Sequence, residues 1–193
     1  MGFWGAQGGA IVDPKRSFRW LVYFGNNVDK KKKVGLRPWY AKTAKKPSFT
    51  VGETQHQFLN HTFWYPGRVV WNDIDITLVD PAGQDDSSGA LMRVLDGMGY
   101  KTPINDYSAS KTITKSEAVK AIGGQVFLTQ LGTDADNPLE TWTLVNPWVK
   151  DVQFGDLSYE DENMVTITLT LKYDYATLDI KGQAQMPTTH AKK

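Results

Sequence analysis

The stretch that decides the fold runs from Met164 to Leu178 and reads MVTITLTLKYDYATL. Because successive side chains of a strand point to opposite faces, its strict alternation predicts one long strand with an apolar and a polar face. Such a strand cannot bury its own apolar face, so further strands and a second layer are required. The predicted apolar face holds Val165, Ile167, Leu169, Leu171, Tyr173 and Tyr175, and the polar face holds Thr166, Thr168, Thr170, Lys172 and Asp174.

A second long strand is predicted between Arg68 and Asp80, ended by Pro81. It follows a strongly aromatic extended segment, Thr54 to Tyr65, and the pair Pro66-Gly67, which favours a turn because proline presets φ and glycine accepts positive φ. One face of this second strand would carry Val70, Ile74, Ile76 and Leu78, and the other Trp71, Asp73, Asp75, Thr77 and Val79.

Shorter segments complete one mainly β domain. Leu91, Val94, Leu95 and Met98 have the spacing of one apolar helix stripe, with caps available at residues 85–87. Thr114 and Glu117 form a capping box for a short second helix that Gly123-Gly124 would end. Strands are predicted at Ser17–Gly25, Pro47–Val51, Gln125–Leu131, Leu139–Asn146 and Trp148–Phe154, the third and fourth of them forming a hairpin.

Composition narrows the class of protein. The 193 residues contain 22 Lys plus Arg, 21 Asp plus Glu and no cysteine, with a formal net charge of +1. The absence of cysteine excludes disulfides and thiol chemistry, and the balanced charge argues against a protein that grips nucleic acid phosphates. No secretory signal and no bilayer-spanning apolar run is present, so a soluble protein without a membrane anchor, kept in a cytoplasm, is expected.

Candidate chemical sites are sparse. Asp73 and Asp75 share a predicted strand face and could hold a divalent metal, but nothing nearby completes a ligand set, which favours an exposed face or a subunit contact. His56 and His61 are five residues apart and would point to opposite faces of a regular strand. No catalytic motif occurs, so no catalytic, metal or cofactor residues are assigned and no enzyme is expected. A metal-dependent hydrolase around Asp73 and Asp75 stays as a minor alternative.

Seven tryptophans allow a different interpretation. Exposed tryptophan on a β-sandwich can stack on sugars, whereas buried or interface tryptophan is the commoner use. A carbohydrate-binding β-sandwich is therefore a second minor alternative. The residues are Trp4, Trp20, Trp39, Trp64, Trp71, Trp142 and Trp148.

Three passages of the sequence occur in the same order as in a known protein family. Residues 49–81 read FTVGETQHQFLNHTFWYPGRVVWNDIDITLVDP, residues 90–100 read ALMRVLDGMGY, and residues 140–176 read ETWTLVNPWVKDVQFGDLSYEDENMVTITLTLKYDYA. Together they resemble the tail tube proteins of contractile-tailed (T4-like) bacteriophages. The resemblance covers about Phe18 to Leu178, and it leaves out the first arm, the lysine loop and the C-terminal tail.

The resemblance implies a β-sandwich or barrel with a flanking α-helix, assembled into hexameric rings that stack into a hollow tube inside a contractile sheath. Genome DNA would pass through the lumen transiently, without specific binding. Implied partners are further copies of the chain, the tail sheath protein, the baseplate tube-initiator, the tail terminator and the tape measure protein. The protein would be made in the host bacterial cytoplasm and reside in the virion. A baseplate tube-initiator and a type VI secretion tube protein share this fold and remain alternatives.

Under this interpretation the domain spans residues 17–178, between a flexible arm at residues 1–16 and a flexible tail at residues 179–193. The polar strand faces are expected at the lumen or a ring surface, and the arm and the charged loop at contacts between rings. The lumen candidates are Asp73, Asp75, Thr77, Thr166, Thr168 and Thr170. The contact candidates are Phe3, Trp4, Lys30, Lys31, Lys32, Lys33 and Trp39.

Overall fold

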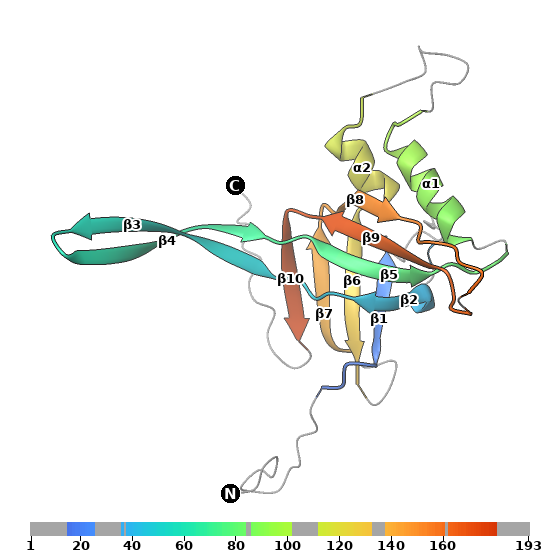
Figure 1. The fold of residues 1–193 in the computed structure, drawn as a ribbon, viewed down its shortest axis with the longest axis horizontal. Helices are drawn as coiled ribbons and strands as arrows, with labels where there is room; N and C mark the ends of the chain where they lie inside the picture. Colours follow the sequence, from blue (N-terminus) through green and yellow to red (C-terminus); the bar gives the residue numbers. More distant parts are fainter. Residues whose placement is uncertain are drawn as a thin grey trace, which may run out of the picture.

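A computed structural model describes residues 15–25, 36, 38–83, 86–101, 112–132, 138–160 and 162–180, with Trp39 described by its backbone only. Within these ranges, ten strands, two α-helices and one short 3-10 helix form two four-stranded sheets packed face to face and a separate two-stranded hairpin (Figure 1). The predicted mainly β domain is therefore confirmed.

Both four-stranded sheets are antiparallel. The first sheet has the order β1-β6-β7-β10 and the second has the order β2-β5-β9-β8. The predicted hairpin of β6 and β7 is confirmed by its register, in which Leu128 faces Trp142. The first sheet comprises β1 (Trp20–Phe24), β6 (Gln125–Leu131), β7 (Pro138–Val145) and β10 (Tyr175–Ile180). The second comprises β2 (Ala41–Ala44), β5 (Ile74–Val79), β9 (Thr166–Lys172) and β8 (Trp148–Gln153). The 3-10 helix η1 (Pro38–Tyr40) directly precedes β2.

The core lies between the two sheets and is centred on β5 and β9. Ile76 faces Leu169 across this strand pair, and both are fully buried. Burying one such side chain contributes roughly 1.5–3 kcal/mol, so the inner faces dominate the stability of the sandwich. The fully buried aliphatic side chains of the two strands are Ile74, Ile76, Leu78, Ile167, Leu169 and Leu171, which meet Val22, Val126 and Leu144 of the first sheet.

The deciding stretch forms two strands, so the prediction of one strand from Met164 to Leu178 is wrong. β9 ends at Lys172 in the second sheet, and β10 begins at Tyr175 in the first. Tyr173 is buried at the crossing, whereas Tyr175, predicted on the same apolar face, is 40% exposed. Side chains face inward at odd positions up to Tyr173 and at even positions from Ala176, which packs against the core beside Leu144. Periodicity did not reveal the crossing, because the apolar Tyr175 prolongs the alternation of the sequence past the corner.

Asp174 holds this corner in place. Its backbone N–H donates to the Val145 carbonyl at 3.1 Å, and its carboxylate accepts from Lys115 Nζ at 2.6 Å and Asn146 Nδ2 at 2.9 Å. The hydrogen bonds from Lys115 and Asn146 lower the pKa of Asp174. Asn146, with φ of +53°, lies where the chain passes from β7 to β8, so the β7–β8 and β9–β10 crossings meet at one corner.

Both predicted helices are present. α1 (Ser87–Gly97) begins after Asp86, whose side chain accepts from Ser88 N–H, and α2 (Lys115–Ala121) begins after Thr114, whose hydroxyl accepts from Glu117 N–H. The two helices lie side by side next to β8 (Figure 1) and bury Val94, Met98 and Ala118 against Trp148 and Val149. No helix in the described part of the chain has the length and hydropathy that crossing a membrane requires.

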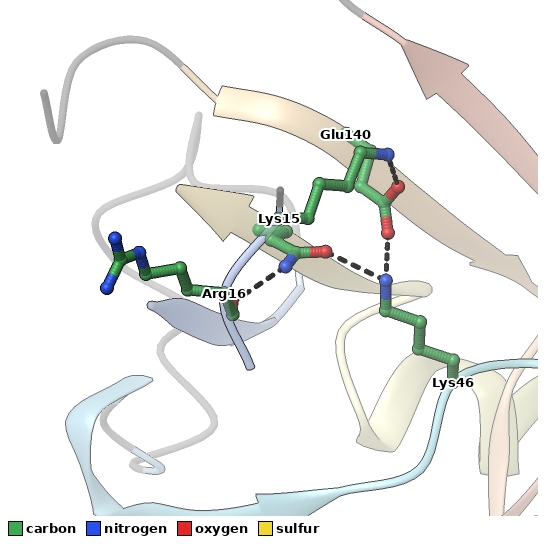
Figure 2. Close-up of polar contacts among 5 residues, drawn as sticks. Lys15, Arg16, Lys46 and Glu140 are labelled. Atoms are coloured by element: carbon green, nitrogen blue, oxygen red, sulfur yellow. Dashed lines mark hydrogen bonds and ion pairs between the residues drawn. The ribbon is translucent and has the colours of Figure 1, made fainter. Parts of the chain in front are cut away.

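One end of the sandwich is closed by a buried carboxylate. Glu140 is 6% exposed and accepts from both Lys15 Nζ and Lys46 Nζ (Figure 2). Gln130 joins the cluster, because its amide oxygen accepts from Lys46 at 2.8 Å and its amide nitrogen donates to the Arg16 carbonyl at 2.9 Å. Burial acts to raise the pKa of Glu140, but the two lysine hydrogen bonds lower it below its ordinary value.

The domain boundaries extend beyond the predicted ones at both ends. Lys15 and Arg16, assigned to the arm, contact the sandwich, and Asp179 and Ile180, assigned to the tail, belong to β10. The candidates Phe3, Trp4 and Lys30 to Lys33 lie outside the described residues.

The prediction of one strand from Arg68 to Asp80 is also wrong, because Asn72 and Asp73 are not in a strand and separate β4 from β5. Before the break, β3 (Phe49–Phe58) and β4 (His61–Trp71) form the separate hairpin, and after it β5 enters the second sheet. Val70, predicted to face inward, is 58% exposed. The turn is at Leu59-Asn60, with Leu59 at φ of +54°, and the predicted Pro66-Gly67 turn lies inside β4.

The assignment of faces can be tested with two neighbouring positions of β9. Leu169→Ala should lower the free energy of unfolding by about 2–5 kcal/mol, because it removes fully buried methyl groups from a packed core. Thr168→Ala, on the opposite face, should change it by less than about 1 kcal/mol. Urea unfolding followed by circular dichroism measures both. Equal losses for the two variants would contradict the assignment.

Candidate functional site

The hairpin of β3 and β4 projects away from the sandwich as a long ribbon (Figure 1). Every residue from 49 to 70 is exposed. A strand of ten residues spans roughly 33 Å, so most of the ribbon lies beyond the two packed sheets. A two-stranded ribbon with both faces in water is at best marginally stable by itself, so this element needs a partner surface.

The hairpin is rich in exposed apolar side chains. It carries nine of the nineteen large apolar residues that are exposed among the described residues. Concentrated exposed apolar surface on a folded protein marks a site of interaction. The nine are Phe49, Val51, Phe58, Leu59, Phe63, Trp64, Tyr65, Val69 and Val70.

Near the Leu59-Asn60 turn, aromatic and imidazole rings lie on one face of the hairpin. The register pairs His56 with Phe63 and Phe58 with His61, and cross-strand partners share a face. The expectation that His56 and His61 point to opposite faces is therefore wrong, because the Leu59-Asn60 turn reverses the chain between them. Among the described residues, no group of three His, Asp or Glu side chains is arranged to hold a metal ion.

A close approach of the two strands divides the hairpin into an inner and an outer half. The register shifts between Val51 and Glu53, so that Gly52 faces two residues of β4. A Cβ atom added to Gly67 would lie 3.1 Å from the Gly52 carbonyl oxygen. The glycine that suggested a turn is therefore required by a bulge, where a side chain would push the strands apart.

Aromatic packing and polar contacts fix the root of the hairpin to the sandwich. The rings of Phe49 and Trp71 pack edge to face with centroids 5.4 Å apart, and the Trp71 ring lies 6.0 Å from that of Tyr173. Asn72 donates from its backbone to the Ser48 carbonyl at 2.9 Å and from its side chain to the Ser48 hydroxyl at 3.1 Å. Burial raises the pKa of the Tyr173 phenol. The root therefore contacts the same residue at which the chain crosses between the sheets.

Asp73 adds charge to this root. Lys150 Nζ lies 2.6 Å from one oxygen of its carboxylate, and Lys172 Nζ lies 2.8 Å from the other. The hydrogen bonds from Lys150 and Lys172 hold the pKa of Asp73 below its ordinary value. Asp73 therefore links the root of the hairpin to strands β8 and β9. It lies between β4 and β5, and not on a regular strand face as predicted.

The other five lumen candidates do lie on one face of the second sheet. Across β5 and β9, Asp75 faces Thr170 and Thr77 faces Thr168, and Thr166 is paired with Val79. The Thr170 hydroxyl donates to the Asp75 carboxylate at 2.8 Å. This polar face is opposite the fully buried aliphatic residues of the same strands, so neither predicted polar set is inside the core.

The described tryptophans are dispersed over the molecule. Trp20 and Trp142 line a cavity of about 180 Å³ at the Glu140 end of the sandwich, which is small beside the roughly 300–1,000 Å³ of ligand pockets. Trp148 packs beneath the helices, Trp71 is at the hairpin root, and Trp64 is on the hairpin. Trp20 and Trp142 are thus the two described tryptophans that share a site, and its small volume argues against a sugar-binding surface.

Neither a protein-family model nor a curated protein matches this sequence. Solved structures do match the fold. One is the tube-terminating cap of the anti-feeding prophage, with a TM-score of 0.60 and 11% identity over 89% of this chain and 94% of the other. Another is the sheath/tube terminator of an extracellular contractile injection system, PVC, with a TM-score of 0.60 and 11% identity over 88% and 99%.

A chain of the anti-feeding prophage baseplate matches with a TM-score of 0.57 and 17% identity over 89% of this chain and 99% of the other. The protein therefore has the fold of tube, cap and baseplate components of contractile injection systems. The predicted tail-tube-like fold, a β-sandwich with flanking helices, is confirmed.

Asp73→Asn should loosen the hairpin without unfolding the sandwich. Both lysines are largely solvated, so a stability loss of about 1 kcal/mol or less is expected. Because the folded pKa of Asp73 is lowered, its contribution is complete above the unfolded pKa and disappears as the pH falls through the folded value. The variant should therefore lose less stability than the parent on acidification.

The orientation of the hairpin can be measured directly, because the chain has no cysteine. Spin labels on Asn60→Cys at the hairpin tip and Ser116→Cys on α2 report the distance between the tip and the sandwich by double electron–electron resonance. Asp73→Asn should broaden this distance distribution, whereas the control Glu117→Gln, which removes an ion pair on α2, should not. An unchanged distribution in Asp73→Asn would contradict the role of the ion pairs.

Proposed function

We propose that this protein is the tail tube subunit of a contractile phage tail, in which copies form hexameric rings that stack into a hollow tube for delivery of the genome. The observation that carries the proposal is the hairpin of residues 49–71, a two-stranded ribbon with nine exposed apolar side chains on the fold of contractile-system tube components. A heterologous contact repeated by rotation closes a ring, and stacking of rings builds a tube.

The polar face of the second sheet is the proposed lumen wall. Asp75, Thr77, Thr166, Thr168 and Thr170 supply no positive charge, so phosphates of passing DNA would find few cations to retain them. The neighbouring Lys150 and Lys172 are paired with Asp73, which reduces their net attraction for DNA. A conduit of this kind requires no cofactor and no catalytic group, and we propose a structural role.

Around this tube, the proposed partners are the tail sheath protein, the baseplate tube-initiator, the tail terminator and the tape measure protein in the lumen. The proposed location is the virion. Phe3, Trp4, the lysines at positions 30 to 33 and Trp39 are proposed as additional contacts between rings.

A second candidate is a protein that begins or ends a tube. The similar folds include a cap, a sheath/tube terminator and a baseplate chain, which favours this candidate alongside the subunit of the tube itself. A type VI secretion-like tube protein is the third variant of the same role. Electron microscopy separates them: a tube subunit forms long stacks, whereas an initiator or terminator forms single rings or caps the end of a tube.

Shortening the hairpin tests the proposal. Replacing residues 54–65 by an Asn-Gly turn removes the outer half and keeps the bulge and the root contacts. The shortened protein should remain folded, because these residues are exposed, and should stay monomeric at concentrations at which the full chain assembles. Sedimentation velocity measures assembly, and the thermal midpoint monitors folding. Rings or tubes formed by the shortened protein would rule out the hairpin as the assembly element.

A milder pair of variants controls for damage to the fold. Phe63→Ser and Trp64→Ser change two exposed rings and should weaken assembly, whereas Phe18→Ser, an exposed ring outside the hairpin, should not.

The lumen face can be tested by cysteine accessibility in assembled tubes. Thr168→Cys should react with a small maleimide before and after assembly, but should lose most of its reaction with a bulky polymer maleimide once tubes form. Thr143→Cys, at a corresponding outward position of the first sheet, is the comparison variant. Unhindered reaction of Thr168→Cys with the bulky reagent in tubes would contradict a lumen position.

A further inference from the structure

A second exposed apolar surface lies in the loop from Phe154 to Val165, between β8 and β9. Leu157 is 86% exposed, Tyr159 is 112% exposed and Met164 is 68% exposed. Gly155 fixes the start of the loop, because at φ of +80° a Cβ atom there would lie 2.5 Å from the Thr166 carbonyl oxygen. The loop therefore leaves the sheet in a defined direction and presents large apolar side chains to water. We name residues 154–160 and 162–165 the acceptor loop.

The acceptor loop and the hairpin lie at opposite ends of the second sheet (Figure 1). The hairpin leads into Ile74, the first residue of β5, whereas the acceptor loop leads into Thr166, which pairs with Val79 at the last position of β5. The hairpin points away from the sandwich, so it does not reach the acceptor loop of its own chain. A second copy, displaced along the strands of this sheet, would bring its hairpin to the acceptor loop of the first.

The apolar area of the hairpin suits a contact between copies. Five aromatic side chains of the hairpin are between 50% and 62% exposed. With 150–250 Å² buried by each fully covered ring, these five would bury on the order of 500 Å². A specific interface buries about 800 Å² on each partner, and the exposed Val51, Leu59, Val69 and Val70 add to the aromatic area.

The two elements also differ in charge, because the acceptor loop is acidic and the hairpin is formally neutral. The described residues of the acceptor loop include three exposed carboxylates, Asp156, Glu160 and Glu162, and no basic residue. The hairpin carries one Arg and one Glu, together with His56 and His61, whose ring N–H groups can donate to carboxylates. The acidic loop would therefore repel another copy of itself but accept the hairpin.

We propose that the acceptor loop of one copy is the docking surface for the hairpin of the next, in a head-to-tail contact. This inference rests on the proposed function, because it names the partner surface of the same hairpin. The contact is heterologous, so each copy retains a free hairpin at one end and a free acceptor loop at the other. Such a contact repeats without limit and sets the direction of the stack.

Substitution on the acceptor loop tests the docking surface. Leu157→Ser together with Tyr159→Ser should abolish stacking while leaving the thermal midpoint of the monomer unchanged, because both side chains are already in water. Phe18→Ser, an aromatic position outside both elements that is 71% exposed, is the control and should assemble as the parent chain does.

Cross-linking tests the same contact by proximity. One preparation carries Asn60→Cys at the hairpin tip, and another carries Ser158→Cys in the acceptor loop. After co-assembly, a short thiol-specific cross-linker should join the two chains, as measured by mass spectrometry. Asn60→Cys mixed with Ser116→Cys, an exposed position on α2, is the control and should give little product.

The outcomes separate the inference from the proposed function. If the acceptor-loop variants stack normally while the shortened hairpin does not, the acceptor loop is not the docking surface and the proposed function stands. If the shortened hairpin also assembles normally, both fail. Equal cross-linking of Asn60→Cys to Ser158→Cys and to Ser116→Cys would likewise overturn the inference.

Discussion

The antiparallel pair of β5 and β9 is the constraint on which the rest of the structure depends. Six aliphatic side chains on its inner face are fully buried, and the outer face carries Asp75 and a row of threonines. A slip of one residue in this register would exchange the two faces and place hydroxyl groups in the core. The buried area therefore fixes both the position of the first sheet and the polar surface on the opposite side.

The hairpin depends on the same strand pair. Its root is fixed by Trp71 against Tyr173 and by Asp73 between Lys150 and Lys172, so residues of β8, β9 and the crossing after β9 all contribute. Tyr173 contacts the hairpin root and also begins the passage to the first sheet. A rigid root presents an otherwise unsupported ribbon in one direction, which lowers the entropy lost when a partner binds it.

The accuracy of the predictions made from the sequence differs between elements. Both helices and the β6–β7 hairpin were correctly predicted, because caps, glycines and the spacing of Leu91, Val94 and Met98 act within a few residues. The two long strands were predicted too long. At the corner the inward positions shift from Tyr173 to Ala176, and at the break they shift from Trp71 to Ile74. The sequence hides both shifts, because the exposed Tyr175 and Val70 are apolar and continue the alternation. The hairpin did have a signal, since Phe63, Trp64 and Tyr65 are consecutive and place rings on both faces of one strand.

The sequence by itself determined which side chains are buried in β5 and β9, because period-two alternation is a local property and burial of apolar area follows from it. It also determined the helices, and by resemblance the type of fold. Only the tertiary structure decided that Asp73 joins two lysines 77 and 99 positions away, that the hairpin and the acceptor loop lie at opposite ends of one sheet, and that Gly67 meets Gly52 instead of forming a turn. These relations join residues far apart in the chain, and pairing between strands, which no local pattern encodes, brings them together.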